Sequence, residues 1–460
     1  MSMAVDGLIS GLDTTSLINQ LMTLEAGPQT LLKAKVTTSN TLTTALQALN
    51  TSVASLATLA AKSATADSLN IYAAKSSSST VTTSAASTAT SGSLDIVVDQ
   101  LAQSQSGVTA AMTVASTTDY TLVANDGTQT SITAASTSLD DVVAAINDAD
   151  AGITATKIAS GTNAAGETQY RLQIVGDETG AESAFELHAG TGAMVDGGTS
   201  TNLLTDTGAA VIRTAQDASV TLWKGTSAEQ AITSSTNTFE DLLPGVAVTV
   251  SAVSNDPVTV SVSRDDAAVS KIASGLVDSL NTLFALISTK SAVVNSTDSS
   301  GAAVVSGGVF SGDSTVRDVK QLIMNAASYP VDGRSPSEIG ISITKTGTLE
   351  YDADKFAAAM AEDPEFVKSV LAEISSRVAD AATSSSDKYD GLITARITGQ
   401  ESLVKDLGTQ IDNWDLRLTS RRSSLERTYA SLEVQLSNMN AQSAWLTAQV
   451  ESLNASKSNN

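Results

Sequence analysis

Apolar residues recur every seven positions along the last part of the chain. The main ladder contains Val404, Ile411, Leu418, Leu425, Leu432, Met439, Leu446 and Leu453. A second line at the complementary spacing contains Leu407, Trp414, Tyr429, Leu436 and Val450. Seven residues nearly complete two helical turns, so the pattern predicts one apolar stripe on a helix that needs a helical partner. The helix would run over about residues 395–453, and about 55 residues at 1.5 Å each would form a rod about 80 Å long.

The beginning of the chain carries a second pattern of the same kind. Its apolar positions alternate at spacings of four and three, and they are Leu42, Leu46, Leu49, Val53, Leu56 and Ala60. A shorter amphipathic helix precedes them and contains Leu17, Ile18, Leu21, Met22 and Leu24. Asp13, Thr14 or Thr15 can cap this helix, and Gly27-Pro28 interrupts it. We interpret the two ends as one paired leg, with two unrelated helical tails as the alternative.

The middle of the chain has a different pattern, dominated by short alternating strands. Residues 120–124 and 129–133 flank Asn125-Asp126-Gly127, which favours a tight hairpin. Ser138 is positioned to cap a helix with Val142, Val143 and Ile146 on its inner face. Further strands are expected at residues 92–100, 154–158, 170–175, 220–223, 246–253 and 258–263. Residues 63–91 are rich in Ser, Thr and Ala and are expected to form a linker or weak strands.

Helical patterns return after the strands. A long helix is expected to begin near Asp265-Asp266, followed by a hairpin over residues 340–351. Short helices are expected over residues 354–361 and from Asp363-Pro364 to Glu373. The fold class is therefore α+β, multidomain and discontinuous. The expected divisions are N-terminal helices at 1–64, a β-rich head near the leg at 65–117 plus 231–264, an outer β-rich head at 118–230, a helical leg domain with a hairpin at 265–394, and the C-terminal coiled-coil helix at 395–460.

Charge is distributed unevenly along the 460 residues. The net charge is −23, yet residues 1–64 sum to zero, as do residues 395–460. The whole excess of acid therefore lies between the helical ends. Neutral ends can pack together in a group of copies, whereas an acidic middle stays solvated. No basic stripe is present, which disfavours a nucleic-acid partner.

Few residues are suited to catalysis or to metal binding. The chain has no cysteine and a single histidine, His188, which argues against a catalytic triad or a zinc site. Asp140-Asp141 and Asp265-Asp266 fit the acidic first turns of helices. We expect no enzyme, no cofactor and no metal site, although an oxygen-ligand calcium site in the acidic head stays open. We also expect no ordinary secretory signal peptide and no membrane span.

Several motifs, in order along the chain, resemble the bacterial flagellar filament-capping proteins, also called flagellar hook-associated protein 2. The opening Gly7-Leu8-Ile9-Ser10-Gly11-Leu12-Asp13, the segment SLDIVVDQLAQSQ at residues 93–105 and Leu243-Pro244-Gly245-Val246 are similar to that family. Residues 131–187 resemble a module shared by flagellins and hook proteins. Ile339-Gly340-Ile341, Gly347-Thr348-Leu349 and Asp363-Pro364 follow, and the end matches at Arg421-Arg422, Met439-Asn440 and Trp445-Leu446.

The resemblance implies a structural role. Such a protein would leave the cell through the flagellar export apparatus, form a homo-oligomeric ring at the distal filament tip, and promote insertion and folding of flagellin subunits while preventing their loss. It also implies an export chaperone on the C-terminal helix. We expect self-association and filament contacts to use the helical ends, specifically Leu17, Leu21, Leu42, Leu46, Leu49, Val53, Leu56, Val404, Leu407, Ile411, Trp414, Leu418, Leu425, Leu432, Leu436, Met439, Trp445, Leu446, Val450 and Leu453.

Other functions remain open at this point. The main alternative is an extracellular adhesin whose β-rich head binds a surface while the helices anchor it; this would add cell adhesion to motility. A coiled-coil translocator of another secretion system would usually carry a membrane-active apolar segment, which the chain lacks. Seven-residue spacing indicates that helices associate but does not give the number of copies.

Overall fold

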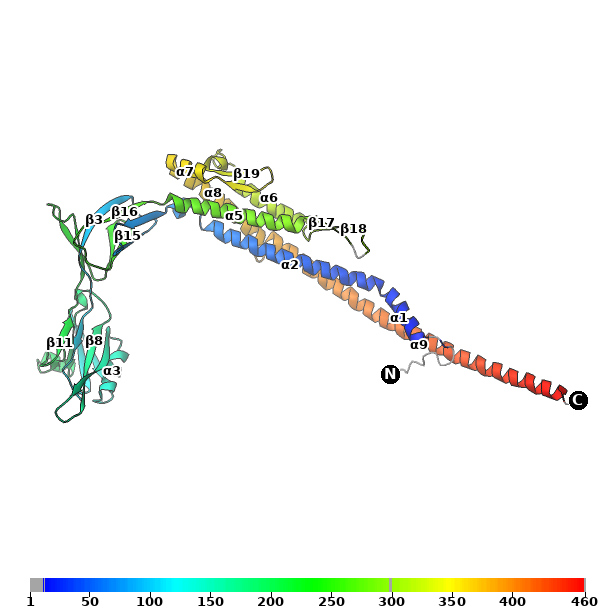
Figure 1. The fold of residues 1–460 in the computed structure, drawn as a ribbon, viewed down its shortest axis with the longest axis horizontal. Coiled ribbons are helices and arrows are strands. Elements are labelled where there is room, and N and C mark those ends of the chain that lie inside the picture. Colours follow the sequence, from blue (N-terminus) through cyan, green and yellow to red (C-terminus); the bar gives the residue numbers. More distant parts are fainter. Residues whose placement is uncertain (1–10, 12, 298–299, 459–460) are drawn as a thin grey trace. The chain divides into compact units, whose positions relative to one another are not determined.

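The computed structural model describes residue 11, residues 13–297 and residues 300–458, with the side chains of Ser296 and of residues 453–458 outside the description. The described chain forms two units. A helical unit combines residues 1–66 with residues 270–460, and a β-rich unit comprises residues 67–269. The β-rich unit is thus inserted in the sequence between the two parts of the helical unit (Figure 1). This confirms the α+β class with helices at both ends, whereas the finer five-part division stays a prediction.

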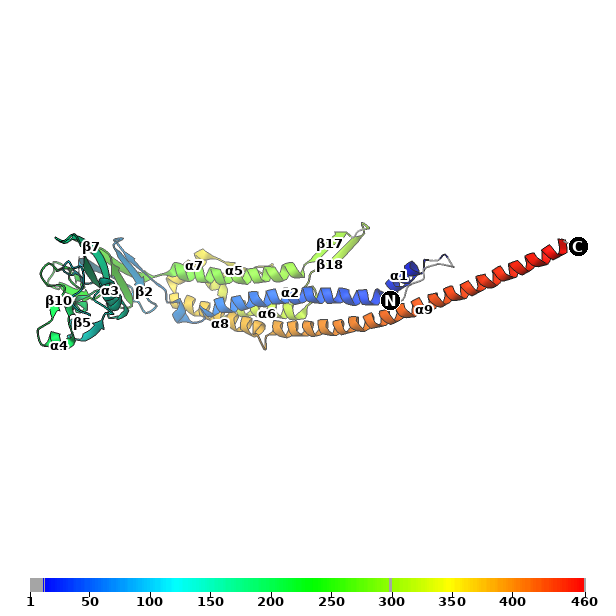
Figure 2. The ribbon, with the colours of Figure 1, turned by 90° about the horizontal axis from the view of Figure 1, so that it is seen from below.

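The helical unit is built on long helices. They are α1 (Thr14–Glu25), α2 (Gly27–Ala61), α5 (Asp266–Ser291), α6 (Ser314–Ser328), α7 (Ala353–Glu362), α8 (Pro364–Ser386) and α9 (Leu392–Ser458). Two small hairpins accompany them, β17 (Val293–Thr297) with β18 (Ala303–Gly307), and β19 (Ile341–Ile343) with β20 (Leu349–Tyr351). The α2 helix packs along both α8 and α9, and Figures 1 and 2 show α2 and α9 side by side.

Local sequence explains where these helices begin. The Asp13 side chain accepts a hydrogen bond from the Ser16 backbone N–H at 2.7 Å and so caps α1, as predicted. Asp352 caps α7 in the same way, and Asp363 caps α8 with Pro364 in its first turn. The α1 helix ends at Glu25 and α2 begins at Gly27, where the Gly27-Pro28 pair was expected to interrupt the helix.

In the β-rich unit, two sheets enclose one apolar core. The larger sheet has the order β1 (Tyr72–Ser76), β16 (Val258–Arg264), β3 (Gly92–Gln100), β12 (Ala218–Leu222) and β13 (Gln230–Ser234). The smaller has the order β14 (Thr238–Leu243), β15 (Val246–Val250) and β2 (Val81–Ala85). Alternate residues of these strands form the core, among them Ile96, Val98, Val220, Val248 and Val260. Such alternation is expected for strands with one buried face.

A second core in the same unit lies among two further sheets and a helix. One sheet has the order β10 (Thr201–Asn202), β9 (Phe185–Ala189), β5 (Asp119–Ala124) and β6 (Gln129–Thr133). The other has the order β11 (Ala210–Arg213), β4 (Ser106–Val108), β8 (Thr168–Gly176) and β7 (Ile153–Thr162). Helix α3 (Leu139–Asp148) contributes Leu139, Val142 and Ile146 to the core, and the short helix α4 (Gly192–Asp196) follows β9.

Most predicted elements are confirmed, with corrections of length. The hairpin at Asn125-Asp126-Gly127 joins β5 and β6, with Gly127 at φ +84°, and Ser138 caps α3. The helix predicted from Pro364 to Glu373 runs to Ser386 because residues such as Val378 and Ala382 continue its buried face. The expected strand 246–253 ends at Val250, after which Ser251 bonds to Thr80. Residues 63–91, expected to form a linker or weak strands, contain the strands β1 and β2.

Helix α5 is the one helix in the described part of the chain that is long and apolar enough to cross a membrane by composition. Its apolar residues, however, pack in a protein core, with Leu276, Leu280 and Leu283 each no more than 3% exposed. A core helix of a water-exposed unit passes the same compositional test, so this helix carries no membrane assignment.

Candidate assembly interface

The two ends of the chain pair in an antiparallel leg formed by α1, α2 and α9. Glu25 bonds to Arg421 at 2.9 Å, Gln29 to Asp415 at 2.5 Å and Ser39 to Gln400 at 2.6 Å. Residue numbers rise along the first partner of each pair and fall along the second, which fixes the antiparallel direction. The predicted pairing of the ends is therefore confirmed, and two unrelated tails are excluded.

The structure brings only part of the predicted contact set into the leg. Five side chains are buried: Leu46, Leu49, Val53, Leu56 and Leu407. Eight are half-buried: Leu21, Leu42, Val404, Ile411, Trp414, Leu418, Leu425 and Leu436. Six are exposed: Leu17, Leu432, Met439, Trp445, Leu446 and Val450. The side chain of Leu453 lies outside the described residues, as do Gly7–Ser10 and Leu12 of the opening motif.

Helix α1 does not bury the face that carries Leu17, Leu21 and Leu24, but an adjacent face. Its buried side chains are Thr14, Ile18 and Met22, whereas Leu24 is 78% exposed. Residues 17, 18, 21 and 22 are all apolar, so the sequence pattern did not show which of these two faces would be buried. On α1, the leucines Leu17 and Leu21 are consequently more available to a partner than Ile18 and Met22.

Polar residues in the leg were missed by the sequence reasoning. The Gln29 amide donates to the Asp415 carboxylate and also, at 3.4 Å, to the Ile411 carbonyl. Ser39 and Gln400 are 5% and 7% exposed, so their hydrogen bond is shielded from water. The signal was present in the sequence, because Ser39 lies seven residues before Leu46 and Gln400 seven before Leu407. Polar residues at such positions specify register, since a slip would leave them unpaired.

The far end of α9 extends beyond its partners. Asn19 of α1 bonds to Arg422, while α9 continues to Ser458. All side chains from Ala441 to Ser452 are exposed, including Trp445, Leu446 and Val450 at 54–63%. Figure 1 shows this red end of α9 continuing past α1. The apolar ladder here lacks a partner among the described residues and forms a candidate assembly surface.

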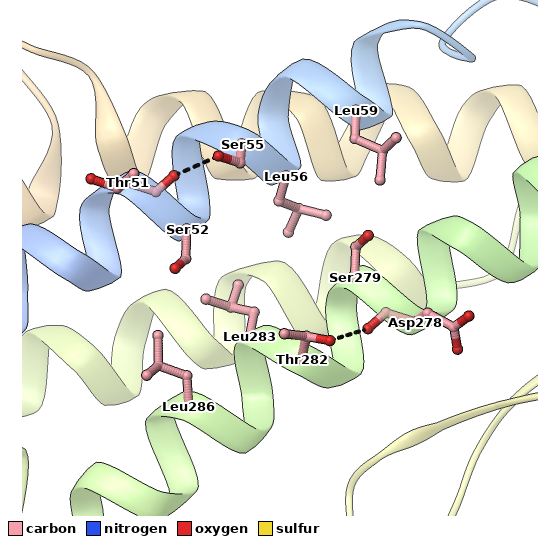
Figure 3. Close-up of a pocket in the computed structure, with 10 residues that line it drawn as sticks. All are labelled: Thr51, Ser52, Ser55, Leu56, Leu59, Asp278, Ser279, Thr282, Leu283 and Leu286. Atoms are coloured by element: carbon pink, nitrogen blue, oxygen red, sulfur yellow. Dashed lines mark hydrogen bonds between the residues drawn. The ribbon is translucent and has the colours of Figure 1, made fainter.

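A groove lies between α2 and α5 within the helical unit. Leu56 and Leu59 line it from α2, and Leu283 and Leu286 line it from α5 (Figure 3). Hydroxyls line the remainder, from Thr51, Ser52, Ser55, Ser279 and Thr282, together with the carboxylate of Asp278. The groove encloses about 590 Å³. Its lining consists of leucine side chains and hydroxyls with one carboxylate, and it has no basic residue.

His188 has partners that suggest catalysis at first sight. Its Nδ1 lies 2.9 Å from the Ser200 hydroxyl, and its Nε2 lies 2.9 Å from the Glu186 carboxylate. The nearby groove that includes Glu186 is lined by neither His188 nor Ser200, so a substrate in it would not reach the serine. Glu186 and His188 share one face of β9, and Ser200 directly precedes β10. The three residues therefore join two neighbouring segments, and no group of potential metal ligands occurs among the described residues.

Comparison with known proteins agrees with this architecture. The family model described as flagellar hook-associated protein 2 N-terminus matches residues 10–105, and the one described as flagellar hook-associated protein 2 C-terminus matches residues 215–441. The B-type flagellar hook-associated protein 2 of Pseudomonas aeruginosa is 27% identical over 225 residues, 47% of this chain and 47% of that protein. Flagellar hook-associated protein 2 of Escherichia coli K12 is 27% identical over 310 residues, 64% of each chain.

A solved structure shares the fold. The crystal structure of the flagellar cap protein FliD D1-D2-D3 domains from Escherichia coli aligns with a TM-score of 0.60 and 24% identity, covering 78% of this chain and 99% of that one. Sequence matches span about half the length of the first curated relatives. At these levels the comparisons define the family and the fold.

Proposed function

The chain belongs to the family of flagellar hook-associated protein 2, and from that premise we propose that it is a structural cap at the distal tip of a bacterial flagellar filament. In this role it forms a homo-oligomeric ring, receives exported flagellin subunits, promotes their insertion and prevents their loss. It would reach the tip through the flagellar export apparatus, and it would not be an enzyme.

One observation carries the proposal: the apolar ladder of α9 continues beyond the part of α9 that pairs with α1 and α2. Trp445, Leu446 and Val450 are exposed although they follow the same spacing as residues that are buried or half-buried nearer the start of α9. A helix of 67 residues that is only partly covered by its own chain is suited to bind other subunits. Part of this surface would be shielded before assembly by an export chaperone bound to the C-terminal helix.

The two units differ strongly in net charge, and the difference supports assembly through the helical units. The β-rich unit has 6 basic and 23 acidic residues, a net charge of −17, whereas the helical unit has 20 basic and 26 acidic residues, a net charge of −6. Copies can therefore approach through their helical units with less repulsion than through their β-rich units. No specific observation favours the adhesin alternative.

The test is deletion of the gene in the bacterium that carries it. Cells would be imaged for filaments, and the medium assayed for unpolymerised flagellin. We expect the deletion to leave bare hooks and to release flagellin into the medium. The full chain should restore the filaments, whereas a chain ending at Asn440 should not. Normal filaments without leakage would overturn the proposal.

A control separates assembly from folding. The chain ending at Asn440 should keep the unfolding transition of the full chain, because the side chains of residues 441–452 are exposed and contribute little to the internal core. A matched internal variant, Leu49→Ala, removes a side chain that is 0% exposed and should lower stability. Loss of capping by the truncated chain with unchanged stability would assign the defect to assembly.

A further inference from the structure

The hairpin strands β17 (Val293–Thr297) and β18 (Ala303–Gly307) display valines on both faces, and we name these two strands the tongue. Val293 and Val305 lie on one face and are 60% and 68% exposed, while Val294 and Val304 lie on the other and are 56% and 39% exposed. An isolated two-stranded hairpin is marginally stable in water. A hairpin with apolar side chains on both faces gains most when it is inserted between the walls of a partner.

The root of the tongue is held firmly to the end of α5. The Gly308 N–H donates to the Ala292 carbonyl at 2.8 Å, and the Phe310 N–H donates to the Lys290 carbonyl at 2.9 Å. Phe310 is 3% exposed, and a side chain at Gly308 would collide with the Lys290 carbonyl. The root is therefore ordered by packing, although the valines beyond it are exposed.

The tongue and the groove between α2 and α5 have complementary chemistry. The groove presents Leu56, Leu59, Leu283 and Leu286 among serine and threonine hydroxyls, with Asp278 as its charged lining residue. From residue 291 to residue 312 the sequence has one charge, Asp298, so the tongue offers valines and hydroxyls without a cation. Such surfaces associate through apolar burial and short polar contacts, not through charge attraction.

A chain cannot fill its own groove with its own tongue in this fold. The groove uses α5 residues 278–286, and the tongue starts beyond the end of α5 at Ser291. Figure 2 shows the two strands continuing away from α5 instead of folding back along it. A tongue that fills the groove therefore comes from another molecule.

We propose that the tongue of one copy inserts into the α2–α5 groove of the next copy, which rests on the ring proposed above. Tongue and groove are different surfaces, so the contact is head-to-tail, and repetition of a head-to-tail contact closes a ring when the rotation permits. Two strands of five residues each offer less surface than the roughly 800 Å² per partner of a stable pair. Each joint is weak alone and gains strength from ring closure.

Disulfide trapping tests the proposal, since the chain has no cysteine of its own. A Val305→Cys chain and a Ser55→Cys chain would be purified separately, mixed and oxidised. We expect a cross-linked dimer in the mixture and at most traces in either chain alone. A chain carrying both substitutions should give a ladder of cross-linked oligomers. The control pairs Val305→Cys with Leu31→Cys, an exposed α2 residue that does not line the groove, and should give no product.

Substitution without cross-linking provides a second measurement. Val293→Ser with Val305→Ser should raise the dissociation constant of the oligomer about a hundredfold in analytical ultracentrifugation, because the loss of apolar burial at each valine weakens the contact about tenfold. The fold should be unaffected because both side chains are exposed in the single chain. The matched control is Val253→Ser, which changes an exposed valine of the β-rich unit.

The outcomes distinguish this proposal from the cap function. Two results would overturn the tongue contact and leave the proposed cap function standing. One is an oligomer that forms without the Val305–Ser55 cross-link. The other is a tongue-to-tongue cross-link in the Val305→Cys chain alone. A cross-link from Val305→Cys to added flagellin, with none to Ser55→Cys, would assign the tongue to flagellin and also overturn it. A chain that remains monomeric at every concentration, with no cross-link, would overturn both proposals.

Discussion

The buried pair of Ser39 and Gln400 provides a sensitive test of how the leg holds its register. The Ser39 hydroxyl donates to the Gln400 side-chain carbonyl at 2.6 Å, and both residues are less than 10% exposed. In Ser39→Ala the glutamine oxygen loses this donor in a place that water scarcely reaches. Leaving a buried polar group unsatisfied costs about 1–3 kcal/mol.

Substitution of the partner residue, Gln400, should cost less stability. In Gln400→Leu the Ser39 hydroxyl can turn to the backbone carbonyl four residues earlier, as Thr41 and Thr43 of the same helix already do at 2.9 and 3.0 Å. In the double variant neither polar group is left, so its loss of stability should be smaller than the sum of the two single losses. The difference is the coupling free energy of the pair.

The assay is urea or thermal unfolding followed by circular dichroism at the helical band, which reports mainly on the helical unit. For a unit of this size, 1 kcal/mol corresponds to about 2–4 °C in melting temperature, so Ser39→Ala should melt about 2–12 °C lower. Thr38→Ala, which removes an exposed hydroxyl one residue away, is the control and should change stability by less than about 0.5 kcal/mol. Strictly additive losses in the double variant would refute the reasoning.

Three further results are expected. Burial would by itself raise the pKa of Asp99, but hydrogen bonds from Lys224 and Thr221 and the charge of Lys224 hold that pKa below its usual value of 3.8. The carboxylate therefore contributes to the stability of the β-rich unit above about pH 3.8. The loss of thermal stability caused by Asp99→Asn should shrink as the pH falls below 3.8; a loss that does not change with pH would contradict this. Gly245→Ala should lower the melting temperature of the β-rich unit more than Gly225→Ala. Both glycines have positive φ, but only at Gly245 would the new methyl group lie 2.9 Å from a backbone atom of Ala89. Equal losses of stability would show that the backbone conformation alone determines the effect. Raising the salt concentration should favour oligomers in light scattering, because it screens the net charge of −17 on each β-rich unit; oligomers that dissociate with salt would point to ion pairs as the main attraction.

The seams of the leg could be predicted from the sequence because their signal is periodic and local. Leu46, Leu49 and Val53 follow the spacing of a buried helical face, and all are 0% exposed. The register could not be predicted in this way, since shifting one helix by seven residues still places most apolar positions opposite apolar positions. It depends on pairs such as Gln29 with Asp415, which lie 386 residues apart in the sequence.

The tongue and the groove escaped the sequence reasoning for a related reason. The valines at 293–294 and 304–305 form short apolar runs among Ser, Gly and Ala, without the length or alternation of a clear strand. The groove exists because α2 and α5 lie alongside each other, and the residues that line it are more than 200 positions apart in the sequence. Leu56 had been assigned to a seam, and its role in lining a groove depends on the partner helix.

Helix α9 shows why a heptad pattern is insufficient to separate folding from assembly. The same spacing runs from Val404 through Leu425, where the side chains are half-buried against the chain's own helices, to Leu446, which is 56% exposed. Nothing in the ladder marks the change, because apolar side chains at this spacing suit an internal or an external partner equally. Beyond Arg422, which bonds to Asn19 of α1, half-buried positions continue as far as Leu436 and Ser437, and every side chain from Ala441 to Ser452 is exposed. The first part of α9 thus stabilises the monomer, and the last part is available for assembly, so substitutions in the two parts should affect stability and capping separately.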